Sequence, residues 1–190
     1  MISEFQIEEW IRGLSAQPAR VKYGSSKALR LASREAPEMV YPHFDRFVAQ
    51  LAGENTIFRW NAAWTLGHLA AADQAGRIEK LLRRFCAPIA GPELIGAANV
   101  IGAAAEIALA KPHLSDRIAG QILHVERASY ATPECRNVAI GHAIRSLGRF
   151  FPAVKRKGPV LEFVRRQLGN PRPATRRKAE QFLQRWQPDR

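Results

Sequence analysis

Apolar side chains recur along this sequence at helical spacing, and the pattern is clearest over residues 59–72. At 100° per residue, Ala62 and Leu66 fall on one side of the predicted helix, and Trp60 and Trp64 fall on the other. Because both sides are apolar, this helix is expected to lie inside an array of helices rather than on a surface.

The same spacing, a small residue followed one turn later by a large one, recurs along the chain. The pairs are Ser25 and Leu29, Ala62 and Leu66, Ala97 and Ile101, Ala143 and Leu147, and Ala179 and Leu183. The large members are separated by 37, 35, 46 and 36 residues, and three of these steps are close to the period of two-helix repeats. A single amphipathic hairpin cannot bury its apolar face alone, so the copies are predicted to stack on a continuous core.

No stretch alternates with a period of two, so every predicted element is a helix. A capping helix is predicted over residues 4–14. Long inner helices are predicted over 20–34, 59–72, 93–110, 133–150 and 174–186, and outer helices over 37–51, 74–85, 112–125 and 159–168. Pro42 is expected to start or kink the first outer helix, and Asn55 or Thr56 to cap the central helix. Residues 126–132 are predicted to form a loop that absorbs the longest step.

The chain resembles the HEAT and armadillo repeat families over nearly its whole length. The residues that carry the resemblance are Arg59, Ala62, Ala63, Leu66, Gly67 and Leu69 in the central helix, with Pro42 before it. Two features depart from the family pattern: Leu94 replaces the cation in the third copy, and the step to the fourth copy is about ten residues longer than the others. The resemblance implies one all-α domain over residues 1–190, a right-handed α–α superhelix (solenoid) of about five two-helix repeats.

Composition restricts the class of protein. Hydrophobic residues make up 46% of the chain, so a folded core is expected. No uncharged apolar run reaches about 18 residues, and the N-terminus lacks a basic segment followed by an apolar one. We therefore expect a cytoplasmic protein with no membrane partner. Cys86 and Cys135 have neither metal-site spacing nor the density of a disulfide framework, and are interpreted as packing thiols.

Charge gives the first indication of function. The chain has 29 lysines and arginines against 17 acidic residues, a net charge of +12, and +9 of this falls within residues 149–190. An anionic partner is therefore expected at the basic C-terminal repeats. The candidate anion-binding residues are Lys155, Arg156, Lys157, Arg172, Arg176, Arg177 and Lys178. The alternative is a charged outer face that keeps a terminal repeat soluble.

A second candidate surface follows from the repeat register. Successive inner helices place Lys27, Trp64, Asn99, Arg145 and Gln181 in one row, on the face that lines the groove of a solenoid. The predicted groove residues are Tyr23, Lys27, Trp64, Asn99, Glu106 and Arg145. Cations beside tryptophans suit an acidic peptide helix or a stacked base. The alternative is that the tryptophans belong to the core. Glu106, which shares the face of Asn99, is expected to be a solvated or arginine-paired groove residue, with a functional acid as its alternative.

The sequence contains no recognisable catalytic motif. Its five histidines form no HExxH pattern, and no GxSxG, P-loop or dinucleotide-binding motif is present. Alkylpurine DNA glycosylases similar to HEAT proteins use tryptophans and an aspartate in a groove. Trp60 and Trp64 match that pattern, but the only acid nearby is Asp73, beyond the end of the helix. We therefore predict a non-enzymatic interaction scaffold, with no catalytic residue, cofactor or metal, that binds an acidic protein or peptide. The alternative is a nucleic-acid-binding protein, for example a DNA-repair protein of the glycosylase type.

Overall fold

The computed structural model describes residues 2–187, and over this range helices are joined by short turns without any strand. The all-helical prediction is therefore confirmed for this part of the chain. Contacts between Cα atoms divide the chain into two compact units, residues 1–81 and 82–190. Each unit is described separately below.

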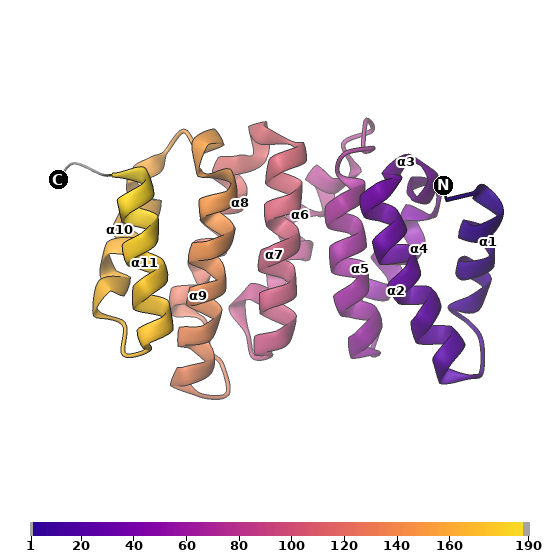
Figure 1. Cartoon of the computed structure of the whole chain (residues 1–190), viewed down its shortest axis with the longest axis horizontal. Coiled ribbons are helices and arrows are strands. Elements are labelled where there is room, and N and C mark those ends of the chain that lie inside the picture. Colours follow the sequence, from indigo (N-terminus) through magenta and orange to yellow (C-terminus); the bar gives the residue numbers. More distant parts are fainter. Residues whose placement is uncertain (1, 188–190) are drawn as a thin grey trace. The chain divides into compact units, whose positions relative to one another are not determined.

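The first unit packs two long helices against each other, with shorter helices around them (Figure 1). Its elements are α1 (Glu4–Gly13), α2 (Ala19–Glu35), α3 (Pro37–Val40), η1 (Tyr41–His43), α4 (Phe44–Leu51) and α5 (Thr56–Leu69). Helix α5 packs on both α2 and α4, and α1 packs on α2. Leu29, Phe47 and Leu66 are buried at the centre of this arrangement, because one face of each helix is apolar.

Local sequence signals determine the helix ends in the first unit. Ser3 caps α1: its hydroxyl accepts from the Gln6 backbone N–H at 3.3 Å, and the Gln6 side chain accepts from the Ser3 N–H at 3.0 Å. Pro42 lies in the 3₁₀ segment η1, which separates α3 from α4, so the predicted break in the outer helix is confirmed. Asn55 caps α5, as predicted, by accepting from the Phe58 N–H at 3.1 Å.

The second unit has two layers of helices. Its elements are η2 (Ala87–Ala90), α7 (Leu94–Ala110), η3 (Pro112–Leu114), α8 (Ser115–Leu123), η4 (His124–Arg127), α9 (Pro133–Phe150), η5 (Phe151–Ala153), α10 (Lys157–Arg166), η6 (Gln167–Gly169) and α11 (Pro173–Trp186), and α6 (Arg77–Cys86) contains the division between the units. Helices α7, α9 and α11 lie side by side in one layer, and α8 and α10 lie behind them (Figure 1). The predicted loop over 126–132 is shorter than expected, because η4 extends to Arg127.

The five long helices begin at regular intervals. The residues immediately before α2, α5, α7, α9 and α11 are Pro18, Asn55, Glu93, Thr132 and Arg172. Their steps are 37, 38, 39 and 40 residues, which is more regular than the steps between the small and large pairs. Counted this way, Ala97 lies one turn earlier in its helix than Ala62 does, and Ala143 lies one turn later. Both alanines are nevertheless fully buried, because a shift of one turn keeps a residue on the same helix face.

All but one of the other residues in the small-and-large pairs also lie in the core. Ser25, Leu29, Ala62, Leu66, Ile101, Leu147 and Ala179 are buried, and Leu183 is partly exposed. None of the described helices is long and apolar enough to cross a membrane.

Candidate binding groove

The second unit has a groove between α9 and α11, with a volume of about 710 Å³. Its lining residues are Leu109, Ile144, Arg145, Gly148, Arg149, Pro152, Lys178, Gln181, Phe182, Arg185 and Trp186. Most of them come from two helices of the same layer. The groove therefore has walls of regular helix, and rigid walls position side chains more precisely than loops do.

Two glycines of α9 face α11, and a side chain at Gly141 would disturb the close approach of the two helices. A Cβ atom on Gly141 would lie 2.9 Å from Thr175 Oγ1 and 3.2 Å from Lys178 Nζ. A Cβ atom on Gly148 would lie 3.5 Å from the Phe182 ring. The two glycines are seven residues apart and therefore share one helix face, so the missing side chains shape the groove along two turns of α9.

Positive charge lines the groove. Arg145 and Arg149 come from α9, and Lys178 and Arg185 come from α11. Among the lining residues, all of which lie in the described part of the chain, none has a carboxylate. Glu106 on α7 neutralises Arg149 from outside this set, through an ion pair of 2.9 Å between its carboxylate and the guanidinium. The charges of the other three cations remain available to an anion.

Lys178 is the least solvated of these cations. Its ammonium lies beside the Gly141 backbone, and the side chain is only partly exposed. Burial lowers the pKa of Lys178, and the positive charges of Arg145 and Arg172 lower it further. No described carboxylate forms an ion pair with Lys178. The groove thus holds a partly buried ammonium among cations, an arrangement that an anion would stabilise.

His142 experiences the same positive field. Burial lowers its pKa, and the charges of Lys178 and Arg145 lower it further. The side chain is half-buried on α9, one turn before Arg145. Positive charge from two helices therefore converges on this end of the groove.

Aromatic rings form an apolar base beside the cations. Phe151 lies 5.0 Å from Phe182 and 5.4 Å from Trp186, measured between ring centroids. The Arg185 guanidinium lies 4.8 Å from the centre of the Trp186 ring, at a cation–π distance. Phe151 and Phe182 are buried and Trp186 is partly exposed, so a ligand would meet a rigid aromatic edge.

The predicted anion-binding residues have different environments. Arg176 donates to the carbonyl oxygens of Asn170 and Pro171. Arg172 forms an ion pair with Glu134. Lys157 lies over the Phe151 ring, 5.5 Å from its centroid. Of the seven, only Lys178 lines the groove.

The remaining three predicted anion-binding residues are exposed outside the groove. Lys155 and Arg156 are exposed, and both donate their backbone N–H groups to Asp116, at 3.1 and 2.9 Å. Arg177 is exposed on α11. The seven predicted anion-binding residues thus divide into cations engaged in the fold, exposed cations, and Lys178 in the groove.

The predicted groove residues are divided between the two units. Tyr23, Lys27 and Trp64 belong to the first unit, and Asn99, Glu106 and Arg145 to the second. The Tyr23 hydroxyl accepts from Asn55 Nδ2 at 3.1 Å, and the Trp64 ring contacts His68, 6.0 Å away between centroids. Lys27 is exposed.

In the second unit, Arg145 is the member of this set that lines the groove. Asn99 Nδ2 donates to the Ile95 carbonyl at 2.9 Å, within its own helix. Glu106 pairs with Arg149, which agrees with the arginine-paired role expected for it.

The groove also contains Arg149, Phe182, Arg185 and Trp186, which were not among the predicted groove residues. A usable signal was present: Lys178, Gln181, Phe182 and Arg185 follow the spacing i, i+3, i+4, i+7, which places them on one face of α11. Arg145 and Arg149 follow the spacing i, i+4 on α9. The sequence therefore indicates which residues share a face of α11, but it does not indicate that this face lies against α9.

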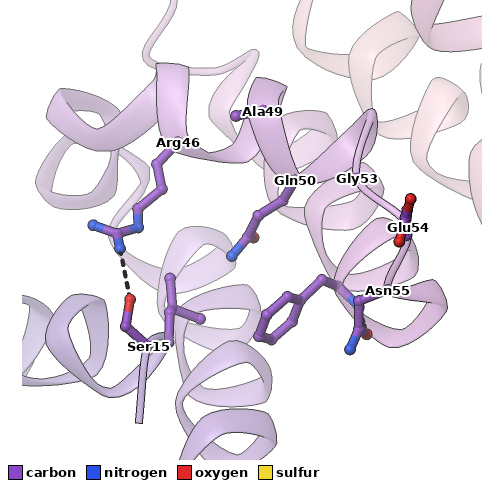
Figure 2. A pocket seen from close by; sticks show the side chains of 9 residues that line it. Ser15, Arg46, Ala49, Gln50, Gly53, Glu54 and Asn55 are labelled. Carbon is purple, nitrogen blue, oxygen red and sulfur yellow. Dashed lines mark hydrogen bonds between the residues drawn. The ribbon is translucent and has the colours of Figure 1, made fainter.

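A smaller pocket of about 380 Å³ lies in the first unit, where the turns after α1 and α4 meet. Figure 2 shows Arg46 reaching across to Ser15, with 3.3 Å between guanidinium and hydroxyl, while Gln50 points into the pocket. Asn55 uses both ends of its amide, one for capping α5 and one for Tyr23. Arg46 and Asn55 are already engaged within the chain, so we favour the groove of the second unit as the binding site.

Asp73, the acid nearest the tryptophans in sequence, has a structural role. It is buried and accepts from the Tyr41 hydroxyl at 2.7 Å. Its two carboxylate oxygens also accept from the backbone N–H groups of Arg77 and Ile78, at 2.9 and 3.0 Å. The carboxylate therefore caps the start of α6.

Comparison with known proteins does not identify a family. No family model matches the sequence, and no match is found among curated proteins. Across residues 2–187, no three His, Cys, Asp or Glu side chains gather in a way that could hold a metal ion.

Proposed function

We propose that this chain is a non-enzymatic binding module that holds an acidic segment of another protein in the groove between α9 and α11. The observation that carries the proposal is the lining itself, four cations above an apolar base without a carboxylate among the described lining residues. Such a surface is complementary to a segment that presents acidic and apolar side chains together.

The distribution of charge between the units supports this assignment. Residues 82–190 contain 19 lysines and arginines against 8 acidic residues, a net charge of +11. Residues 1–81 contain 10 against 9, a net charge of +1. An acidic partner would therefore be attracted to the unit that contains the groove, and the attraction would weaken with added salt.

The proposal includes a HEAT-like arrangement, in which the long helices line the concave face of a right-handed superhelix. Two observations support it: the steps of 37 to 40 residues between helix starts, and the two layers of helices in the second unit. In repeats of this kind, the groove face is the usual site for protein partners.

Nucleic acid is the second candidate partner, and the exposed cations outside the groove favour it. Lys155, Arg156 and Arg177 are exposed and suit phosphate contacts. Phosphate contacts do not require an apolar base, however, so a duplex held through its phosphates would leave the partly exposed Trp186 unused. The acidic protein segment accounts for both the cations and the aromatic rings.

Fluorescence anisotropy with two labelled probes tests the choice. The first is an acidic peptide of about 15 residues, with Glu and Asp on one helical face and Leu and Phe on the other. The second is a DNA duplex of about 20 base pairs. We expect the full chain to bind the acidic peptide, and to bind a version with Gln and Asn in place of the acids at least about tenfold more weakly.

Paired variants locate the site. Arg145→Glu with Lys178→Glu should weaken peptide binding at least about tenfold, because it reverses two charges in the groove. Lys155→Glu with Lys157→Glu changes the net charge equally, and should weaken binding much less. Tighter binding of the duplex than of the peptide, with equal losses in the two variants, would contradict the proposal and favour the nucleic-acid alternative.

A further inference from the structure

We propose that a carboxylate of the partner is seated between Arg145 and Lys178, and that its binding is coupled to the uptake of a proton by His142. This inference rests on the proposed function, and adds to it a defined anchor point and a dependence on pH. It follows from the arrangement of charges on α9 and α11.

The anchor point is defined by the backbone as much as by the side chains. Because Gly141 has no side chain, the Lys178 ammonium can lie beside α9, 3.2 Å from where a Cβ atom would be. Arg145 lies one turn further along the same helix, and its charge acts on Lys178. Two cations from different helices thus flank one position, which suits a single carboxylate placed between them.

His142 lies next to this position along α9 and is subject to its positive charge. It is adjacent to Gly141 in sequence and one turn before Arg145. The two charged groups that act on it are Lys178 and Arg145, both positive. A bound carboxylate would offset these charges, and would therefore favour the protonated imidazole.

The carboxylates on α7, on α8, in η4 and at the start of α9 are engaged with other groups and do not neutralise this cluster. On α7, the only charged residue is Glu106, and it pairs with Arg149. On the other side of α9, Asp116 accepts from the backbone of Lys155 and Arg156, and Glu126 binds Arg166 and Gln167. Glu134, at the start of α9, pairs with Arg172.

The prediction is that the partner binds more tightly as the pH falls. Above the titration range of His142, the ring is neutral in both free and bound chains and no proton is taken up. Within that range, binding requires a proton, so lower pH favours the complex. If the bound carboxylate raises the pKa of His142 by about one unit, the affinity changes about tenfold across the transition.

The acidic peptide probe measures this effect directly. Anisotropy titrations of the full chain between about pH 5.5 and 8 keep the carboxylates of the probe ionised, because their ordinary pKa values are near 4. We expect the affinity to fall as the pH rises, and the dependence to disappear in His142→Gln. His124→Gln, at an exposed histidine outside the groove, should retain the full pH dependence.

A measurement on the unmutated chain guards against a variant that fails to fold. The ring proton of His142, followed by NMR, should titrate at higher pH when the probe is bound than when it is absent. If the ring of His142 titrates at the same pH with and without the probe, the coupling is overturned but the proposed function stands. An unchanged pH dependence of binding in folded His142→Gln would have the same consequence. Absence of probe binding at every pH would overturn both.

Discussion

Arg59 and Arg176 make the same pair of hydrogen bonds at equivalent positions in two long helices. Each lies four residues after the residue that precedes its helix, and each donates to the carbonyl oxygens of the residues five and six positions before it. The distances are 3.2 Å to Glu54 and 3.3 Å to Gly53 for Arg59, and 3.2 Å to Pro171 and 2.8 Å to Asn170 for Arg176. The shared role is to tie the preceding turn to the first turn of the helix.

Because of this role, replacing Arg176 should mainly affect stability. Arg176→Ala removes two charge-assisted hydrogen bonds, and should lower the free energy of unfolding by about 1 kcal/mol, since the side chain is only partly buried. Arg177→Ala, at the exposed neighbour, should change it by less than about 0.5 kcal/mol. Urea denaturation of both variants measures the difference, and equal effects would show that the Arg176 hydrogen bonds do not contribute.

Replacing Gly141 and Gly120 by alanine should have opposite effects on stability. In Gly141→Ala, the new methyl group would meet Thr175 Oγ1 at 2.9 Å, and Thr175 is held by its hydrogen bond to the Asn137 carbonyl. We expect a loss of about 1–3 kcal/mol from overpacking. Gly120→Ala, in α8 with open space around the added Cβ, should instead stabilise the chain by up to about 1 kcal/mol. Thermal unfolding of both variants tests this; a stabilised Gly141→Ala would mean that α11 is not closely packed there.

These residues also show what the sequence could and could not reveal. The positions of the helices could be predicted from the spacing of apolar residues, the break in the first outer helix from Pro42, and the start of α5 from Asn55. These signals are local in the sequence. Counted from the helix starts, the repeat register is shifted by one turn at Ala97 and Ala143, since those helices are rich in small residues and several pairs satisfy the same spacing. The helix starts, set by turns and caps, give the regular steps of 37 to 40 residues.

The groove was only partly predictable, because its residues come from two helices. Arg145 and Lys178 were each identified, but in different sets, one from the repeat register and one from the basic segment. Arg145 and Lys178 line the same groove because Gly141 lets α11 approach α9. No local pattern in the sequence specifies which residues of one helix face another helix. Phe182 and Trp186 were missed for the same reason.

Replacing Asp73 should destabilise the first unit more than replacing its partner Tyr41. Asp73→Ala leaves the Tyr41 hydroxyl and two backbone N–H groups without their acceptor, and should cost about 2–4 kcal/mol. Tyr41→Phe removes one of these hydrogen bonds, and should cost about 1 kcal/mol. Burial and the bond to Asp73 raise the pKa of Tyr41, so its absorbance should titrate above pH 10 in the folded chain. Equal losses in the two variants would contradict the capping role of Asp73.

His142 predicts a pH effect on the free chain that has the opposite sign to its effect on binding. Its folded-state pKa lies below the ordinary value of 6.5. As the pH falls through 6.5, the unfolded chain therefore takes up the proton first, and the folded state loses stability. In His142→Gln, stability should fall less between about pH 7.5 and 5.5, with a slope that differs by at most about 1.4 kcal/mol per pH unit. Identical slopes in urea denaturation would contradict the lowered pKa.

The most direct test of the account is to locate the acidic peptide on the full chain by NMR. Backbone amide shifts recorded during a titration should change most at Gly141, Arg145, Gly148 and Lys178, and the side-chain indole N–H shift of Trp186 should change with them, because these residues line or border the groove. The account predicts that these signals move together with one dissociation constant. Changes that gather instead around Lys155 to Lys157 or in the first unit, with the groove signals unmoved, would contradict it.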